Sequence, residues 1–331
     1  MRIAGAIAAV VIAAAAAWTC AALGMKSLIG IALPYAGLTA LVAGMAFRVA
    51  RWTMTPVPFN IAVTCGQQKS IPGVRPDPLD NPQRPWTAAL RVIIEAALFR
   101  SLFRNSKARR SRNAIVYGPS TWLWLGSMAF HWTMLIIVLR HLRLAIEPVP
   151  AWAELLQRAD GIFHIGTPPL LLTDIIILCA LLFLIMRRIA DRKTAYISLF
   201  QDYFFLALIG AVALSGIWLR HFSRVDLLAV KQYVLGLLAL KPALPDGAPP
   251  SFYVHITLVS ILAAAIPAGK ISHMAGMFLS PTRNTAADSR RRRHINPWNP
   301  DVPVHTYREW EEEFRERLVK AGYDLEGDGN G

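Results

Sequence analysis

The stretch PSTWLWLGSMAFHWTMLIIVLRHLRL, residues 119–144, decides the fold class of this chain. It is long enough to cross a bilayer as a helix, which takes about 20 predominantly apolar residues. Two histidines, His131 and His141, lie inside it. Ionisable side chains within a membrane span are costly, and they are usually functional. The stretch therefore predicts a transmembrane helix that contributes to a functional site.

The composition of the 331-residue chain is that of a polytopic membrane protein. The chain is 54% hydrophobic and its mean hydropathy is +0.39, which is too apolar for a soluble domain of this length. The net charge of +14 is gathered in loops between apolar stretches, as the positive-inside rule requires. We therefore expect no nucleic-acid partner. Cys20, Cys65 and Cys179 form no CxxC or CxxCH motif, so neither a zinc site, an iron–sulfur site nor a covalently attached c-type haem is indicated.

Apolar stretches predict an all-α bundle of six transmembrane helices. They are residues 3–25, 27–47, 119–144, 167–186, 197–219 and 251–271. The first stretch has a signal peptide as its alternative, but it is long for an h-region and we expect a retained helix. Six spans put the basic segments 48–118, 187–193 and the tail on one side, which is cytoplasmic by the positive-inside rule. We expect a multi-pass protein of the bacterial inner (cytoplasmic) membrane with both termini in the cytoplasm.

Two amphipathic helices are expected outside the spans. Residues 86–104 place apolar side chains at helical spacing, with Arg91 and Glu95 on the other side. Such a helix lies in the headgroup layer, or it faces solvent or a partner. In the tail, Thr306 and Glu309 form a capping box. An apolar stripe of Trp310, Phe314 and Leu318 follows at helical spacing. Gly322 then follows as the expected C-cap.

The tail helix has nothing in its own segment to cover its apolar stripe. We therefore expect it to dock on a soluble partner, while the arginine run 290–293 has anchoring to anionic lipid as an alternative role. The chain is thus expected to have four parts. They are two N-terminal transmembrane helices (1–47), a basic cytoplasmic loop with an amphipathic helix (48–118), a four-helix core (119–273) and a cytoplasmic docking tail (274–331).

Four histidines lie on the third and the last expected span. His131 and His141 are about 15 Å apart along a helix, and His255 and His273 are about 27 Å apart. The two spans run in opposite directions, so His141 is expected to face His255 near the outer surface and His131 to face His273 nearer the cytoplasm. The two heights differ. Helix tilt, a break at Pro267 and the width of two macrocycles must absorb the difference.

Two histidines on each of two spans suffice for two bis-histidine haems. A metal transport site is the alternative, but it would need carboxylates nearby, and the acidic residues of the spans, Asp174 and Asp202, are distant in sequence. A single histidine in a span is more often a hydrogen-bonded packing residue. His164 and His221 lie on the outer side. Each has the chemistry to bind a quinone carbonyl or to transfer a proton, and each has an interfacial packing role as its alternative.

The histidine spacings, ten residues and eighteen residues, resemble those of the diheme membrane subunit of respiratory nitrate reductase. The tail segments HMAGMFLSPTRN, RRRRHINPWN and VHTYREWEEEF are similar to those of the DsrM-type cytochrome b subunit of the sulfite-reduction-associated transmembrane complex. This resemblance implies two b-type haems, a menaquinone-class partner and a cytoplasmic iron–sulfur partner related to the heterodisulfide reductase catalytic subunit. The nitrate reductase relative has a quinone-site lysine near the position of His164, which makes that residue a quinone-site candidate.

The expected function is that of an electron-transfer subunit rather than a stand-alone enzyme. We expect a six-span cytochrome b that passes electrons between menaquinol or menaquinone and the cytoplasmic iron–sulfur subunit, in dissimilatory sulfur metabolism and together with other membrane and periplasmic subunits. Two alternatives stay open. One is a haem-free structural anchor of a respiratory complex, and the other is the gamma subunit of a nitrate-reductase-like enzyme.

Overall fold

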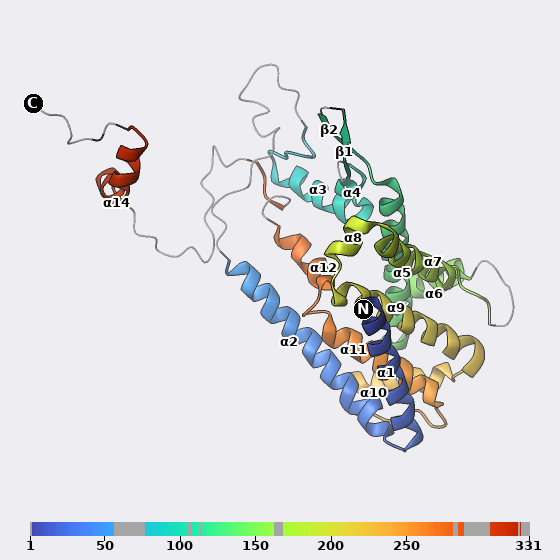
Figure 1. The fold of residues 1–331 in the computed structure, drawn as a ribbon. Helices are drawn as coiled ribbons and strands as arrows, with labels where there is room; N and C mark the ends of the chain where they lie inside the picture. The colour runs from blue at the N-terminus through green and yellow to red at the C-terminus, as the bar shows by residue number, and fades with distance from the viewer. Residues whose placement is uncertain are drawn as a thin grey trace, which may run out of the picture.

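The computed structural model describes residues 2–55, 77–104, 107–112, 114–161, 168–280, 284–287, 305–323 and 325. Within these residues the chain is helical apart from one two-stranded hairpin (Figure 1). The predicted all-α class is confirmed for this part of the chain. The length of the apolar runs predicted this class. In lipid, a single span can satisfy its backbone N–H and C=O groups only through the hydrogen bonds within a helix.

Four helical segments of the described residues are long and apolar enough to cross a membrane. They are α1 (Arg2–Ala22), η1 with α2 (Leu28–Ala32 and Leu33–Thr53), α5 with η2 (Thr121–His141 and Leu142–Leu144) and α9 with η3 (Phe200–Trp218 and Leu219–Ser223). A fifth consists of α11 (Pro250–Ala265) and the segment Lys270–Leu279, which are bent by 66° against each other. These segments support the expected multi-pass membrane protein.

The remaining expected span corresponds to α7 (Leu172–Ala190). This helix has Asp174 in its first turn and Arg187 and Arg188 in its last. By length and composition it is not among the described helices that could cross a membrane. It nevertheless packs between α5 and α9, where Ile177 and Leu181 meet Ile209. A sixth crossing therefore stays a prediction.

Small residues set the close packing of the helices. On α1, Ala6, Ala17 and Ala21 are buried against α9 and α11. A Cβ atom at position 37 of α2 would lie 2.6 Å from the carbonyl oxygen of Ser260 on α11, so this helix crossing requires Gly37. Lipid gives helices no hydrophobic drive to associate, and association rests instead on such close van der Waals contact.

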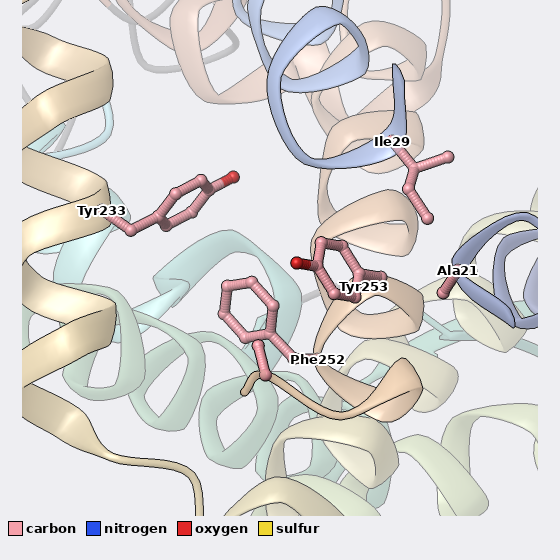
Figure 2. Close-up of a cluster of buried hydrophobic side chains, with 6 residues drawn as sticks. Ala21, Ile29, Tyr233, Phe252 and Tyr253 are labelled. Atoms are coloured by element: carbon pink, nitrogen blue, oxygen red, sulfur yellow. The ribbon is translucent and has the colours of Figure 1, made fainter. Parts of the chain in front are cut away.

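An aromatic cluster closes one end of the bundle (Figure 2). Tyr233 of α10 (Leu227–Leu238) packs edge-on against Phe252, which packs in the same way against Tyr253. The Tyr233 hydroxyl donates to the carbonyl oxygen of Gly30 at 2.6 Å, in the π-helical turn η1. Residues 220–250, which connect the fifth and sixth expected spans, are therefore not all loop. Residues 227–238 are apolar but too short to span a membrane, and they form a capping helix instead.

Three other connections between the expected spans, residues 145–166, 187–193 and 48–118, also contain regular structure. The outer loop contains α6 (Ala151–Asp160), and the basic connector after α7 contains α8 (Arg192–Ile197). The basic loop contains α3 (Pro85–Leu98), α4 (Arg100–Phe103) and an antiparallel hairpin of β1 (Lys107–Ser111) and β2 (Ala114–Gly118). The helix predicted over residues 86–104 is thus present but broken at Phe99. Most of its proline-rich approach, residues 56–76, lies outside the described residues.

The chain ends in α14 (Tyr307–Lys320), which Figure 1 shows apart from the bundle. Its predicted capping box is confirmed. The Thr306 amide donates to the Glu309 carboxylate at 2.8 Å, and the Thr306 hydroxyl accepts from the Glu309 amide at 3.3 Å. Gly322 has a φ of +83° and follows the helix as expected. The arginine run 290–293 lies outside the described residues.

Figure 1 shows α3, α4, α8 and the hairpin gathered at one end of the bundle. The α1–α2 connection and α10 lie at the other end. This arrangement agrees with the expected grouping of the basic segments on one side of the membrane.

Candidate functional site

The break in the last span brings two of the four candidate ligands together. Helix α11 ends at Ala265, and the chain resumes as η4 (Lys270–Ser272) and α12 (His273–Gly276). The imidazole centroids of His131 and His273 are 6.0 Å apart, with an angle of 73° between the ring planes. A straight helix would have extended His273 about 12 Å beyond Ala265. The bend removes much of the height mismatch expected from the sequence.

Side chains from two other helices hold this break in place. Arg48 of α2 donates to the carbonyl oxygen of Pro267 and, at 3.4 Å, to that of Gly269. These two carbonyls belong to the turn where the helical hydrogen bonding stops. On the far side of the turn, Lys270 donates to Asp202 of α9 at 2.7 Å. The position of His273 therefore depends on α2 and α9 as well as on its own segment.

The other two candidate ligands, His141 and His255, lie nearer the end of the bundle that contains α10. His141 is the last residue of α5, and His255 lies in the second turn of α11. A Cβ atom at position 216 of α9 would lie 3.3 Å from His255 Cε1, so Gly216 leaves room beside this ring. His141 and His255 therefore lie toward the same end of the bundle, on α5 and α11 respectively.

Three of the four imidazoles are oriented by their own helical turn. In each, Nδ1 lies within hydrogen-bonding distance of a backbone carbonyl three or four residues earlier. The bonds are His131 to Ser127 at 2.7 Å, His141 to Ile137 at 2.7 Å and His273 to Lys270 at 2.6 Å. A carbonyl oxygen can only accept, so Nδ1 bears the proton and Nε2 has the free lone pair. Metal-ligating histidines are usually oriented in this way.

His255 reaches the same state through another helix. The Ser215 hydroxyl of α9 donates to the carbonyl oxygen of Val212 at 3.0 Å, and its oxygen lies 2.9 Å from His255 Nδ1. Because the hydroxyl hydrogen is directed to Val212, the oxygen accepts from Nδ1–H. Ser215 was not predicted as a site residue. It lies 40 positions from His255 in sequence, and nothing in the sequence around it marks the contact.

The donor set fits bis-histidine haem. A metal about 2 Å from the nearest nitrogen of each of two imidazoles separates their ring centroids by about 6 Å, which is the distance between His131 and His273. In the described part of the chain no group of three or more His, Cys, Asp or Glu side chains gathers as a metal cage would. A haem needs no such cage, because its porphyrin supplies four of the six iron ligands and the protein supplies the axial ones.

A buried ionic network lies next to His141. Arg140 of α5 forms an ion pair with Asp160 of α6, and the Asp160 carboxylate accepts from the Thr173 amide at 2.8 Å and from its hydroxyl at 2.6 Å. Asp160 and Thr173 are buried along with Arg140. The network therefore ties α5, α6 and the start of α7 together at the end of the bundle that holds the His141–His255 pair.

Several polar atoms at the same end are buried without a hydrogen-bond partner among the described residues. They are Asp174 Oδ2, Arg220 Nε and His221 Nε2. Such atoms are rare in folded proteins, and each calls for a ligand or water to satisfy it. His221 lies in η3, a π-helical turn, and such turns often occur at functional sites. His164, the other quinone-site candidate, lies outside the described residues.

Comparison with known proteins extends this picture over most of the chain. Residues 85–284 match the nitrate reductase gamma subunit family. A protein of Archaeoglobus fulgidus named Hdr-like menaquinol oxidoreductase cytochrome b-like subunit is 36% identical over 283 residues, which are 83% of this chain and 85% of that protein. A protein of the same name from Archaeoglobus profundus is 38% identical over 285 residues, 82% of this chain and 84% of the relative.

Proposed function

Because this chain belongs to the nitrate reductase gamma subunit family, we propose that it is a diheme cytochrome b subunit of a membrane-bound menaquinol oxidoreductase complex. It exchanges electrons between menaquinol or menaquinone and a cytoplasmic iron–sulfur subunit of the heterodisulfide reductase type. The tail motifs favour the DsrM type within this family, and with it a role in dissimilatory sulfur metabolism. Other membrane and periplasmic subunits complete the complex.

The observation that supports this proposal most directly is the shared state of the four histidines. Each Nδ1 is engaged by a carbonyl or hydroxyl oxygen, so each Nε2 is free to act as a ligand. His131 and His273 would hold one haem b, and His141 and His255 the other. Haem, when bound, supplies an iron that accepts and releases one electron at a time. The two pairs would hold the two haems at different heights in the bundle.

The quinone site of this proposal lies at the end of the bundle that holds His141 and His255. Menaquinol gives up two protons with its two electrons, so a group that accepts a proton must lie near it. His221 has a buried Nε2 without a partner among the described residues, and it is the first candidate for this role. His164 is the second.

The docking surface for the iron–sulfur partner is α14, and both termini lie in the cytoplasm. The rings of Tyr307, Trp310 and Phe314 follow one another along the helix at centroid distances of 5.8 Å. Tyr307 and Trp310 are exposed. Anionic headgroups would repel the glutamates of this helix, which favours a protein surface over the membrane as the partner of its aromatic stripe.

The family match also supports a second candidate, the gamma subunit of a nitrate-reductase-like enzyme. The two candidates share the diheme core and differ in the soluble partner. Purification of the native complex and identification of its subunits separates them. A heterodisulfide-reductase-like iron–sulfur protein supports the first, and a nitrate-reductase-like catalytic subunit supports the second.

The haem assignment is tested by the reduced-minus-oxidised spectrum of the purified subunit and its histidine variants. We expect a b-type α band with two components. His141→Ala and His255→Ala should each remove one component, and His131→Ala and His273→Ala the other. Absence of any b-type band would leave a haem-free anchor as the function. Loss of the same component from the His131 and His255 variants would show that the pairing is wrong.

A further inference from the structure

The bend between α3 and α4 is built on an unusual backbone conformation. Phe99 connects the two helices with φ of 47° and ψ of 46°, which is the left-handed helical region. Glycine adopts this region freely, whereas a bulky side chain is strained there. A residue with a large side chain persists in such a conformation when the surrounding structure holds it, and such positions cluster at functional sites.

The Phe99 ring lies against one of the candidate ligands. Its centroid is 4.9 Å from that of His131, with an angle of 52° between the planes. The ring of His131 also contacts His273 at 6.0 Å and its neighbour Phe130 at 5.1 Å. The strained residue of the α3–α4 bend therefore contacts the imidazole of the His131–His273 pair directly.

Two tryptophans of α5 fix the end of α3 that leads into the bend. The Trp124 indole donates to the carbonyl oxygen of Leu98 at 2.7 Å, and the Trp132 indole donates to that of Ala97 at 2.9 Å. Both carbonyls lie at the end of α3, where helix geometry leaves them without intrahelical partners. The bend is thus attached to the same helix that contains His131.

Ion pairs hold the bend from its other side. Arg100 and Arg104 of the α4 segment both bind the carboxylate of Asp80, the latter at 2.7 Å. Partial burial raises the pKa of Asp80, but the hydrogen bond and charge of Arg100, with the charge of Arg104, outweigh it and hold that pKa below its ordinary value. Asp80 therefore stays ionised at neutral pH, and the attachment persists under ordinary conditions.

We propose that Phe99 is a positioning residue that covers the His131–His273 pair, fixing the His131 ring and excluding water from the haem between them. This inference rests on the proposed function. Water beside a haem favours the oxidised iron, which has the greater positive charge, so solvent exposure is one of the factors that set its reduction potential. A role as an aromatic cover explains why this position holds phenylalanine, although glycine would adopt the same backbone conformation without strain.

Three variants of the full chain in its native complex test this role. Phe99→Ala removes the ring, and Phe99→Gly removes the ring and also relieves the backbone strain. Phe103→Ala is the matched control, because Phe103 lies in the same bend but packs on Trp124, at 5.2 Å, rather than on a histidine. The measurements are the low-spin ferric signals in electron paramagnetic resonance and a redox titration of both haems in membranes.

We expect Phe99→Ala and Phe99→Gly to shift the ferric signal of one haem and to lower its reduction potential, leaving the other haem unchanged. The affected haem should be the one lost in His131→Ala and His273→Ala. Phe103→Ala should leave both haems at their wild-type values. Phe99→Gly decides the question if Phe99→Ala does not accumulate, since glycine suits the backbone at this position.

Wild-type signals and potentials in both Phe99 variants would overturn the inference. An equal shift in Phe103→Ala would also overturn it, because the effect would then come from general loosening of the bend. Failure of the proposed function itself is recognised separately, since the wild-type complex would then show no bis-histidine haem signal before any variant is compared.

Discussion

Replacing Asp160 by alanine should destabilise the end of the bundle that holds His141. The Asp160 side chain is 3% exposed and forms an ion pair with Arg140, which is 7% exposed. It also accepts two hydrogen bonds from Thr173. The substitution leaves a buried guanidinium without a counter-charge and a backbone amide of α7 without its acceptor.

The expected loss of unfolding free energy is about 4 kcal/mol. Removing one partner of a buried ion pair costs about 3–5 kcal/mol, and the unpaired Thr173 amide adds a cost that overlaps with it. A loss of this size lowers the folding equilibrium constant about a thousandfold, at about 1.4 kcal/mol for each factor of ten. The double variant Arg140→Met with Asp160→Met should lose only about 1–3 kcal/mol, because apolar replacement of a whole buried pair is often neutral and what is left is the cost of the unpaired Thr173 amide.

Titration of the purified protein with a denaturing detergent, followed by tryptophan fluorescence, measures these differences. Glu154→Ala is the matched control on the same helix, since Glu154 pairs with Arg158 at 3.9 Å on an exposed face, and such pairs contribute less than about 1 kcal/mol. An Asp160→Ala variant within about 1 kcal/mol of the wild type would refute the reasoning. A double variant as unstable as Asp160→Ala would refute the charge argument in particular.

Three further predictions concern the quinone site, the tail and the orientation of His255. His221→Ala or His164→Ala should slow haem reduction by a menaquinol analogue about a hundredfold with the haem spectrum intact, and unchanged kinetics in both variants would move the site elsewhere. Deletion of residues 296–331 should release the soluble partner and leave both haems bound, since no proposed ligand lies beyond His273, and full co-purification would contradict the docking role. Ser215→Ala removes the hydroxyl partner of His255 Nδ1, at a cost of about 0.5–1.5 kcal/mol. It should lower occupancy of the His141–His255 haem alone, and equal occupancy of both haems by pyridine haemochrome assay would count against it.

The parts of the fold that the sequence predicted are those determined within one segment. Each long apolar run contains a helix, although the last breaks after Ala265, because length and hydropathy settle helix formation locally. The tail helix was predicted from Thr306 to Gly322 for the same reason, since a capping box and a C-cap glycine act within a few residues. The bundle class and the helical tail therefore needed no tertiary information.

The parts that sequence reasoning missed depend on contacts between distant segments. Helix α10 was not predicted, because the segment of residues 227–238 is too short to span a membrane. Its role appears when the Tyr233 hydroxyl donates to the Gly30 carbonyl across the bundle. The left-handed conformation of Phe99 goes against the preference of its own residue type and is compensated by α5. Ser215 and His255 are ordinary residues of two apolar helices until α9 packs on α11.

The arrangement of the histidines was predicted in part, because it depends on the local pattern of each span and also on contacts between spans. The sequence predicted a pairing of the four histidines, which stays a prediction, and the expected misfit in height pointed to the break at Pro267. It did not indicate that the segment after the break turns by 66°, nor that Arg48 and Asp202 hold it. The magnitude of a bend follows from what packs around it, which a single segment does not encode.

The way the four imidazoles are held implies an order of assembly. His131, His141 and His273 are oriented by carbonyls of their own turn, so each is set as soon as its helix forms in the membrane. His255 depends on a hydroxyl from α9, so it is set when α9 and α11 have associated. Three of the rings are therefore oriented during insertion of the chain. The His255 ring waits for the bundle to close, and so does the position of His273, which Arg48 and Asp202 hold through the break before it.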